Sequence, residues 1–120
     1  MRLMNLVALA TLFAAAPLYA ANFGGVGIDG VPLENGEILI RQLVVGGPAH
    51  EAGLKPGDVI IEIDKTPTAG SNFKDVIDHH LRGEAGTAVT LSIRRQPRAN
   101  PLVFTLTRRS LIVGNDPNHR

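Results

Sequence analysis

A run of closely spaced glycines near the start of the chain is the part of the sequence best suited to binding. Gly24, Gly25 and Gly27 stand within the segment Phe23–Ile28. Glycine lets successive main-chain amides point into one concavity, and such a nest of N–H groups holds an anion. The segment opens a strand instead of following one into a helix, so it does not match a dinucleotide-binding fingerprint. The candidate binding residues are Gly24, Gly25, Val26, Gly27 and Ile28.

Other polar residues do not form a recognisable reactive centre. Asp75 and His79 are four residues apart on an expected helix, but two ligands make no metal site, and a solvated helix face is the default interpretation. The only serines are Ser71, Ser92 and Ser110, and none lies in a nucleophile-elbow, Ser-Lys or Ser-His-Asp pattern. There is no cysteine. We therefore expect a recognition module without catalytic residues, metal or cofactor.

The last third of the chain is rich in arginine and has no acidic residue between positions 85 and 115. We expect the final hairpin to bring its arginines to one end of a sheet. This end is either an ordinary solvated hairpin tip or a surface that docks on an acidic partner or a membrane face. The arginines are Arg94, Arg95, Arg98, Arg108 and Arg109.

Glycine, proline and asparagine or aspartate divide the chain into short elements that must position these groups. Apolar residues that alternate with polar ones, or that run in short blocks, predict strands. The expected strands are 26–31, 37–45, 59–63, 87–95 and 102–108. The expected helices are 49–52 and 73–82. Pro48 favours the start of the first helix and Gly53 its end, and Asn72 caps the second. The composite is mainly β with two helices: a compact, partly open barrel of five to six strands.

The longer expected helix carries a second group of candidate residues. Its apolar residues follow helical spacing, but the sequence does not settle which of them face the core and which face a binding surface. For His80, partial exposure and a hydrogen bond to a ligand side chain remain open alternatives. The candidate residues are Phe73, Val76, Ile77 and His80, with Leu81 behind them.

The first twenty residues differ from the rest of the 120-residue chain. A charged start, an apolar stretch and small residues near Ala20 are typical of a cleaved secretory signal. An uncleaved membrane anchor is the alternative, although the stretch is short for a span and contains Pro17. Removal of 1–20 leaves equal numbers of basic and acidic residues. This balance argues against a general nucleic-acid binder, whose affinity comes from neutralising phosphates.

Several motifs stand in register along the chain. They are Phe23-Gly24-Gly25-Val26-Gly27-Ile28, Gly46-Gly47-Pro48-Ala49, Ala52-Gly53-Leu54-Lys55-Pro56-Gly57-Asp58-Val59-Ile60 and Leu81-Arg82-Gly83-Glu84-Ala85-Gly86-Thr87. Together they resemble the PDZ domain, and this resemblance makes the helix expected at 73–82 the second wall of a groove beside the glycine run. The glycine run is similar to the carboxylate-binding loop of bacterial carboxy-terminal processing proteases. The strand order resembles the bacterial, permuted form, in which the last strand takes the place of the usual first. The resemblance covers about 23–111, and we expect a signal at 1–20, the domain at 21–113 and a polar tail at 114–120.

This resemblance implies a function. PDZ domains bind a C-terminal peptide or exposed strand of another protein by β-augmentation, in which the peptide joins the edge of a sheet. We expect a periplasmic or secreted stand-alone adaptor or regulator whose partner is a protein C-terminus, including that of a periplasmic protease or its substrate. The alternatives are an accessory subunit of an extracytoplasmic protease and an interaction protein that uses the basic hairpin. PDZ domains commonly carry a basic side chain just before the glycine loop, and Ala21 and Asn22 supply none.

Overall fold

The structure is a computed structural model that describes residues 23–110. The signal expected at 1–20 and the polar tail expected at 114–120 lie outside the described residues. The strands are β1 (Phe23–Gly24), β2 (Ile28–Pro32), β3 (Ile38–Leu43), β4 (Val59–Ile63), β5 (Thr66–Pro67), β6 (Gly83–Glu84), β7 (Ala88–Arg94) and β8 (Leu102–Thr107). The helices are α2 (Pro48–Ala52), α3 (Phe73–Val76) and the π-helical turn η1 (Ile77–Leu81).

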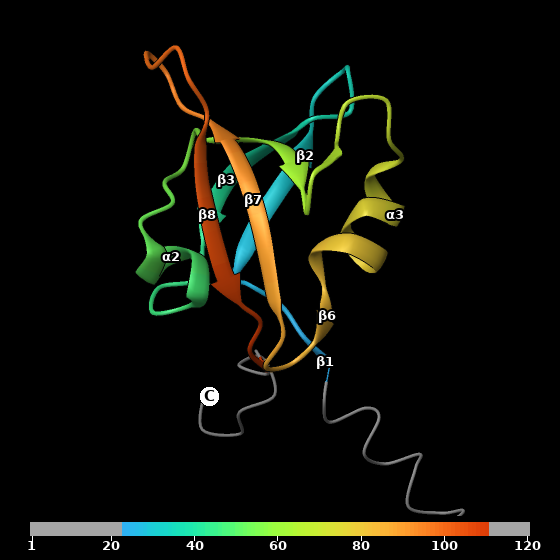
Figure 1. Cartoon of the computed structure of the whole chain (residues 1–120), viewed down its shortest axis with the longest axis vertical. Coiled ribbons are helices and arrows are strands. Elements are labelled where there is room, and N and C mark those ends of the chain that lie inside the picture. The colour runs from blue at the N-terminus through green and yellow to red at the C-terminus, as the bar shows by residue number, and fades with distance from the viewer. Residues whose placement is uncertain (1–22, 111–120) are drawn as a thin grey trace, which may run out of the picture.

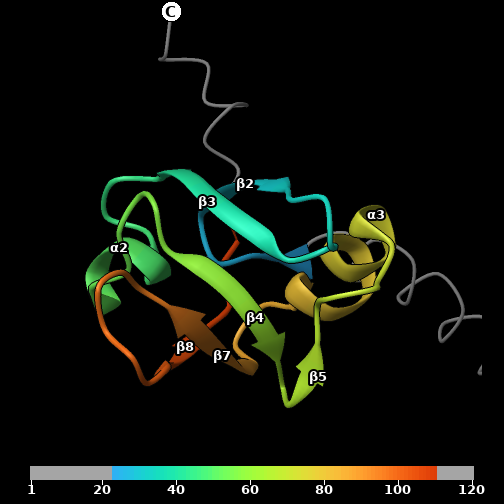
Figure 2. The ribbon, with the colours of Figure 1, turned by 90° about the horizontal axis from the view of Figure 1, so that it is seen from above.

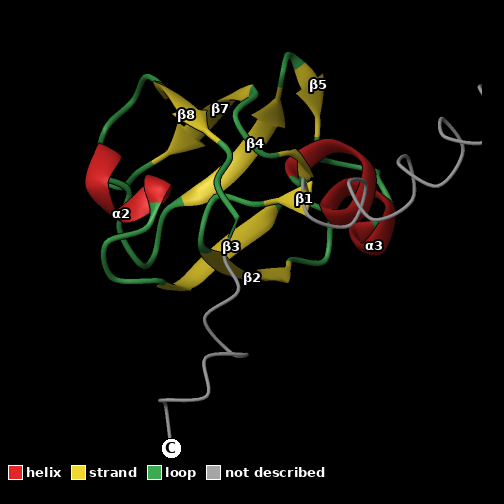
Figure 3. Cartoon of the chain, turned by 90° about the horizontal axis from the view of Figure 1, so that it is seen from below, coloured by secondary structure: helices red, strands yellow, loops and turns green. Residues whose placement is uncertain are grey.

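The strands form one curled antiparallel sheet and one small pair (Figure 1). The sheet has the order β2-β3-β4-β7-β8, with β5 paired to β4, and β1 pairs separately with β6. The helices α2 and α3 lie on opposite sides of the curl (Figure 2). Seen from below, β1 lies beside α3 (Figure 3). Both β2 and β8 are edge strands of this sheet within the described part of the chain. The expected partly open, mainly β architecture with two helical segments is confirmed.

The core fills the inside of the curl. Val89, Leu91 and Ile93 are almost fully buried, as their alternation along β7 predicts. Ile38 and Ile40 of β3 are completely buried beside them. Leu81, at the end of η1, belongs to the same cluster, so the longer helical segment is anchored on the core.

Local signals in the sequence set the ends of the helices. Gly53 has a φ of 100°, the left-handed conformation expected after α2. The side chain of Asn72 accepts a 3.0 Å hydrogen bond from the main-chain N–H of Asp75, as expected of an N-cap. Asp58 accepts a 2.9 Å bond from the N–H of Lys55 and closes the turn before β4. The predicted roles of Gly53 and Asn72 at the helix ends are confirmed.

Three expected elements are different in the structure. The first expected strand, 26–31, begins only at Ile28, because Gly27 has a φ of 79° that interrupts an extended chain. The helix expected over 73–82 is α-helical only to Val76 and then widens into η1, where the N–H of Arg82 bonds to the carbonyl of Ile77 at 3.0 Å. The strand expected at 37–45 is shorter, Ile38–Leu43, because the chain turns at the following glycines.

Candidate functional site: a groove at the edge of the sheet

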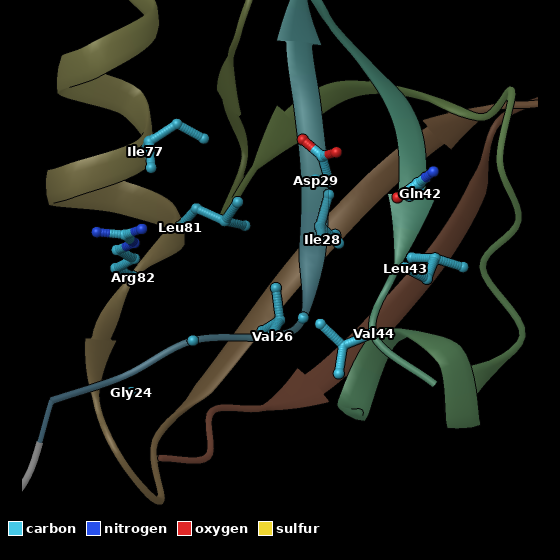
Figure 4. A pocket seen from close by; sticks show the side chains of 12 residues that line it. Gly24, Val26, Ile28, Asp29, Gln42, Leu43, Val44, Ile77, Leu81 and Arg82 are labelled. Atoms are coloured by element: carbon cyan, nitrogen blue, oxygen red, sulfur yellow. The ribbon is translucent and has the colours of Figure 1, made fainter. Parts of the chain in front are cut away.

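A groove of about 460 Å³ lies between the free edge of β2 and the α3–η1 segment (Figure 4). Its floor and walls are mostly apolar, and polar groups stand at its rim. Both the glycine run and the second helical segment border it, as the sequence analysis expected. The lining residues are Gly24, Gly25, Val26, Gly27, Ile28, Asp29, Gln42, Leu43, Val44, Ile77, Leu81 and Arg82.

The edge of β2 is open to a further strand. Ile28 stands opposite Leu43, and the N–H of Val44 bonds to the carbonyl of Gly27 at 3.0 Å. In an antiparallel pair this pattern makes Ile28 and Leu43 a non-hydrogen-bonded pair, so the main-chain groups of Ile28 point away from β3. They point toward the groove, where an added strand can bond to them.

Two amides at the start of this edge have no acceptor. The carbonyls of Val26 and Gly27 face the fold, where they accept from Ala49 and Val44 at 2.9 and 3.0 Å. The N–H groups of Val26 and Gly27 donate no hydrogen bond to any of residues 23–110. The φ of 79° at Gly27 turns its amide away from β3. Two successive main-chain amides without an acceptor within 23–110 thus stand at the end of the groove, the arrangement that an anion-binding nest requires.

Glycine is required at position 27 for two reasons. A residue with a Cβ is strained at a φ of 79°. A Cβ on Gly27 would also lie 3.2 Å from the Cβ of Val44. A side chain here would disturb the loop as well as obstruct the amides.

The helical wall presents a different set of residues from the one that simple helical spacing suggests. Ile77 and Leu81 line the groove, because the wide turn of η1 carries both to the side that faces β2. Val76 is 6% exposed and belongs to the core, and Phe73 packs against that core from its edge. His80 is exposed and borders a separate cavity of about 20 Å³ near Thr68. Of the four expected wall residues, the structure brings only Ile77 to the glycine run.

The groove also includes residues that the sequence analysis did not single out. Gln42, Leu43 and Val44 reach it because β3 is the neighbour of β2, a pairing that the sequence could have indicated through the short turn between the two strands. Asp29 lies at the rim, where its carboxylate forms a 3.0 Å ion pair with the exposed Arg41. None of these residues carries a local sequence signal of binding.

Arg82 supplies a cation at the groove. It follows η1 directly and lies across from Gly24 in the close view (Figure 4). Its guanidinium is 3.9 Å from the carboxylate of Asp78. A 2.7 Å hydrogen bond from Lys74 lowers the pKa of Asp78 below its ordinary value, so this carboxylate stays ionised between two cations. Arg82 therefore places a basic side chain at the groove, on the wall opposite the glycine run.

The expected basic end of the final hairpin is not present. Arg94 ends β7 and Arg95 follows it at the hairpin turn, whereas Arg108 and Arg109 follow the end of β8 that lies away from this turn. The two strands pair antiparallel from Ile93 with Leu102 to Ala88 with Thr107, which places Arg108 seven residue steps from Arg94 along the ladder, about 24 Å at about 3.4 Å per residue. The prediction that all of these arginines gather at one end of the sheet is wrong.

Most of these arginines are also engaged within the fold. Arg95 bonds to the buried Asp58 at 2.8 and 2.7 Å. The other ion pairs are Arg94 with Glu37 at 2.7 Å and Arg109 with Glu51 at 3.2 Å. Arg108 donates to main-chain carbonyls. Their charges are therefore partly neutralised inside the domain, and a docking surface built from them has no support in the structure.

Neither a metal cluster nor a membrane-spanning helix occurs among the described residues. Asp75 and His79 lie 3.9 Å apart as an exposed pair, and within 23–110 no third histidine, cysteine or acidic residue joins a group that could hold a metal ion. No helix in this range is long and apolar enough to cross a membrane.

Comparison with known proteins places this geometry in a family. Residues 39–95 match the family model described as PDZ domain. A carboxy-terminal-processing protease of Bartonella bacilliformis is 37% identical over 86 residues, which are 72% of this chain and 19% of that protein. The matching region thus spans less than a fifth of the length of this curated relative.

Solved structures agree with the sequence match. The photosystem II D1 C-terminal processing protease is 30% identical with a TM-score of 0.69, over 86% of this chain and 26% of that chain. The PDZ domain of a carboxy-terminal protease from Vibrio cholerae, solved in complex with peptide, is 27% identical with a TM-score of 0.64, over 73% of this chain and 95% of that chain. In this chain β8 also holds the edge position beside β7 that the permuted strand order predicts. The chain therefore carries a PDZ domain similar to those of the carboxy-terminal processing proteases.

Proposed function

We propose that this domain binds the C-terminal end of another protein, which joins the sheet as a strand beside β2. The terminal carboxylate then accepts hydrogen bonds from the amides of Val26 and Gly27. The observation that carries this proposal is the pair of amides without an acceptor within 23–110, next to an open strand edge. A C-terminal peptide can satisfy both features at once, because it has an anionic carboxylate at the end of an extended chain.

The lining of the groove favours an apolar last residue in the bound peptide. Val26, Ile28, Ile77 and Leu81 surround the space next to the amides. A buried polar side chain would find no partner among these four side chains, and its desolvation would oppose binding. We assign the binding role to 24–28 together with the residues of η1 that line the groove. Phe73 and Val76 support this wall from the core, and His80 lies outside it.

A comparison of peptides with free and with amidated C-termini tests the carboxylate assignment. The full chain is titrated with a library of labelled peptides, and the tightest binders are remade as carboxamides of the same sequence. Hydrogen bonds to a charged group contribute about 1.5–3 kcal/mol, so the free acid should bind at least about tenfold more tightly. Equal affinity for acid and amide would mean that the groove takes internal strands. The absence of any binder would reject the proposal.

The relatives support a second, broader part of the proposal, which concerns where the domain acts. The leader-like residues 1–20 and the similarity to processing proteases favour an adaptor or regulator outside the cytoplasm. Its partner would be an extracytoplasmic protease, for which it serves as an accessory, or a substrate of such a protease. Capture from an extracytoplasmic extract tests this, with wild type compared against a variant whose groove is blocked. Recovery of the same proteins by both would count against a role for the groove.

A further inference from the structure

Arg108 makes hydrogen bonds to several segments that surround the end of the groove. It follows β8 directly and is half-buried. Its Nε donates to the carbonyl of Leu81 at 3.0 Å, and one Nη donates to the carbonyl of His80 at 2.8 Å. The other Nη donates to the Oγ1 of Thr87 at 2.9 Å and to the carbonyl of Ala88 at 3.1 Å. One guanidinium thus joins the end of the helical wall to the start of β7.

The carbonyls that Arg108 holds are those that a helix leaves without partners at its end. The last carbonyls of a helix need hydrogen-bond donors from elsewhere, and a cation there also compensates the negative end of the helix dipole. Leu81 supplies one of these carbonyls, and its side chain also lines the groove. The position of the guanidinium therefore fixes where the Leu81 side chain stands relative to β2.

The same guanidinium packs on the small strand pair that carries the glycine run. A Cβ on Gly83 would lie 2.9 Å from both the Cζ and the Nε of Arg108, so the side chain passes directly over this glycine. Gly83 pairs with Gly24 across β1 and β6. The next residue, Arg109, exchanges main-chain hydrogen bonds of 3.0 and 2.9 Å with Gly25. Two adjacent residues therefore hold the two sides of the groove.

We propose that Arg108 is a positioning residue for peptide binding: it sets the distance between the η1 wall and the glycine run. This inference rests on the proposed function, because it assigns a role in that groove. Arg108 touches no bound peptide in this proposal. It acts through the carbonyls of His80 and Leu81 and through its packing on Gly83.

The test compares Arg108→Lys with a matched control, Arg95→Lys. Lysine keeps the charge but cannot reproduce the planar fork of four hydrogen bonds. Arg95 is also engaged by its guanidinium, with Asp58 and the carbonyl of Gly53, and none of these three residues lines the groove. The full chain is used, with the tightest free-acid peptide of the library as probe, under conditions where denaturant titration shows each variant to be folded.

Both substitutions should lower the midpoint of unfolding, but only Arg108→Lys should weaken peptide binding, by about tenfold or more. Affinity that is unchanged in Arg108→Lys, or reduced equally in Arg95→Lys, would overturn the proposal. If Arg108→Lys does not fold, Gly83→Ala replaces it. Its methyl group would displace the guanidinium while the charge remains, and it should weaken binding in the same direction.

Hydrogen exchange gives a readout that does not depend on any peptide. In Arg108→Lys, the amide of Arg82, which bonds to the carbonyl of Ile77 across η1, should exchange at least about tenfold faster, whereas amides of β4 should change little. Arg95→Lys should leave the Arg82 amide unchanged. Unaltered exchange at Arg82 in Arg108→Lys would reject the anchoring role even where a peptide binds. If wild type binds no peptide, the proposed function fails, and exchange alone still decides whether Arg108 anchors the wall.

Discussion

Val44 packs directly against Gly27. Its N–H bonds to the carbonyl of Gly27 at 3.0 Å, and its Cβ lies 3.2 Å from the place that a Gly27 Cβ would occupy. Val44 is nevertheless 43% exposed, because it stands at the mouth of the groove. A change in this side chain therefore alters the surroundings of the amide nest without opening the core.

We expect Val44→Asp to weaken the binding of free-acid peptides by at least about tenfold. The introduced carboxylate would stand beside the site of the peptide carboxylate, and two like charges at short range in a partly desolvated groove repel each other. Calorimetric titration of both proteins with the same peptide measures the effect.

Val45→Asp is the matched control for this experiment. Val45 is the next residue, is 83% exposed and does not line the groove. Its substitution should change affinity by less than about twofold, since a charge in open solvent is well screened. Equal losses in the two variants would indicate a general effect of added negative charge and would count against the assigned carboxylate position.

Arg82→Gln should weaken binding by a smaller amount, about two- to fivefold at low salt. The guanidinium lines the groove but is half-exposed, and exposed charge pairs contribute about 0.2–1 kcal/mol. The difference from wild type should shrink as ionic strength rises. Titrations at low and high salt measure how the affinity of each protein for the peptide changes with ionic strength.

His80→Ala serves as the control for Arg82→Gln. His80 lies in η1 but borders the other cavity. The affinity of His80→Ala for the peptide should therefore remain within about twofold of that of wild type from pH 5 to 8, the range over which histidines change charge. A parallel dependence on salt in wild type and Arg82→Gln would show that this arginine does not act on the peptide.

Glu37→Gln should remove part of the pH dependence of stability. A 2.7 Å bond from Arg94 lowers the pKa of Glu37 from its ordinary 4.5, and its side chain is only 13% exposed. A carboxyl whose pKa is lower when folded stabilises the protein above its unfolded pKa, and this stability is lost as pH falls through the folded pKa. The free energy of unfolding, measured by urea titration, should thus differ most between wild type and variant above about pH 5 and converge in acid.

The exposed Glu34 in the same turn provides the comparison for Glu37. Glu34→Gln removes the same charge from an exposed position, so a change shared by both variants would report the net charge and not the pair with Arg94. A Glu37→Gln curve that runs parallel to wild type from neutral pH down to about pH 3 would mean that the pair with Arg94 contributes nothing.

Local chemistry in the sequence predicted much of the fold. Gly53 and Asn72 act through their own backbone or nearest neighbours, so their roles at helix ends could be inferred without tertiary structure. The alternation along β7 indicated its buried face, because strand periodicity depends only on the chain itself. The left-handed conformation of Gly27 is likewise a local property that glycine adopts readily, whereas the binding role expected of the glycine run stays a prediction.

The remainder of the site depends on partners that are distant in the chain. The prediction of the groove wall assumed about 3.6 residues per turn of helix. The turn of η1 is wider, and His80 therefore lies away from the groove. The destinations of Arg95 and Arg108 could not be predicted either. Arg95 meets Asp58 across 37 residues of sequence, and Arg108 meets Leu81 across 27. Five arginines in an acid-free segment led us to expect one basic end of the sheet, either a solvated tip or a docking surface, whereas four of them form hydrogen bonds within the fold.

The bonds between Gly25 and Arg109 join positions 84 residues apart, close to both limits of the described domain. Contacts of such high sequence separation carry the largest loop-closure entropy, so the intervening strands must assemble before these bonds become favourable. During synthesis the peptide groove is therefore completed only when the end of β8 has emerged. A chain that stops short of Arg109 retains the residues of the apolar core but leaves Gly25, at the end of the groove, without its main-chain partner.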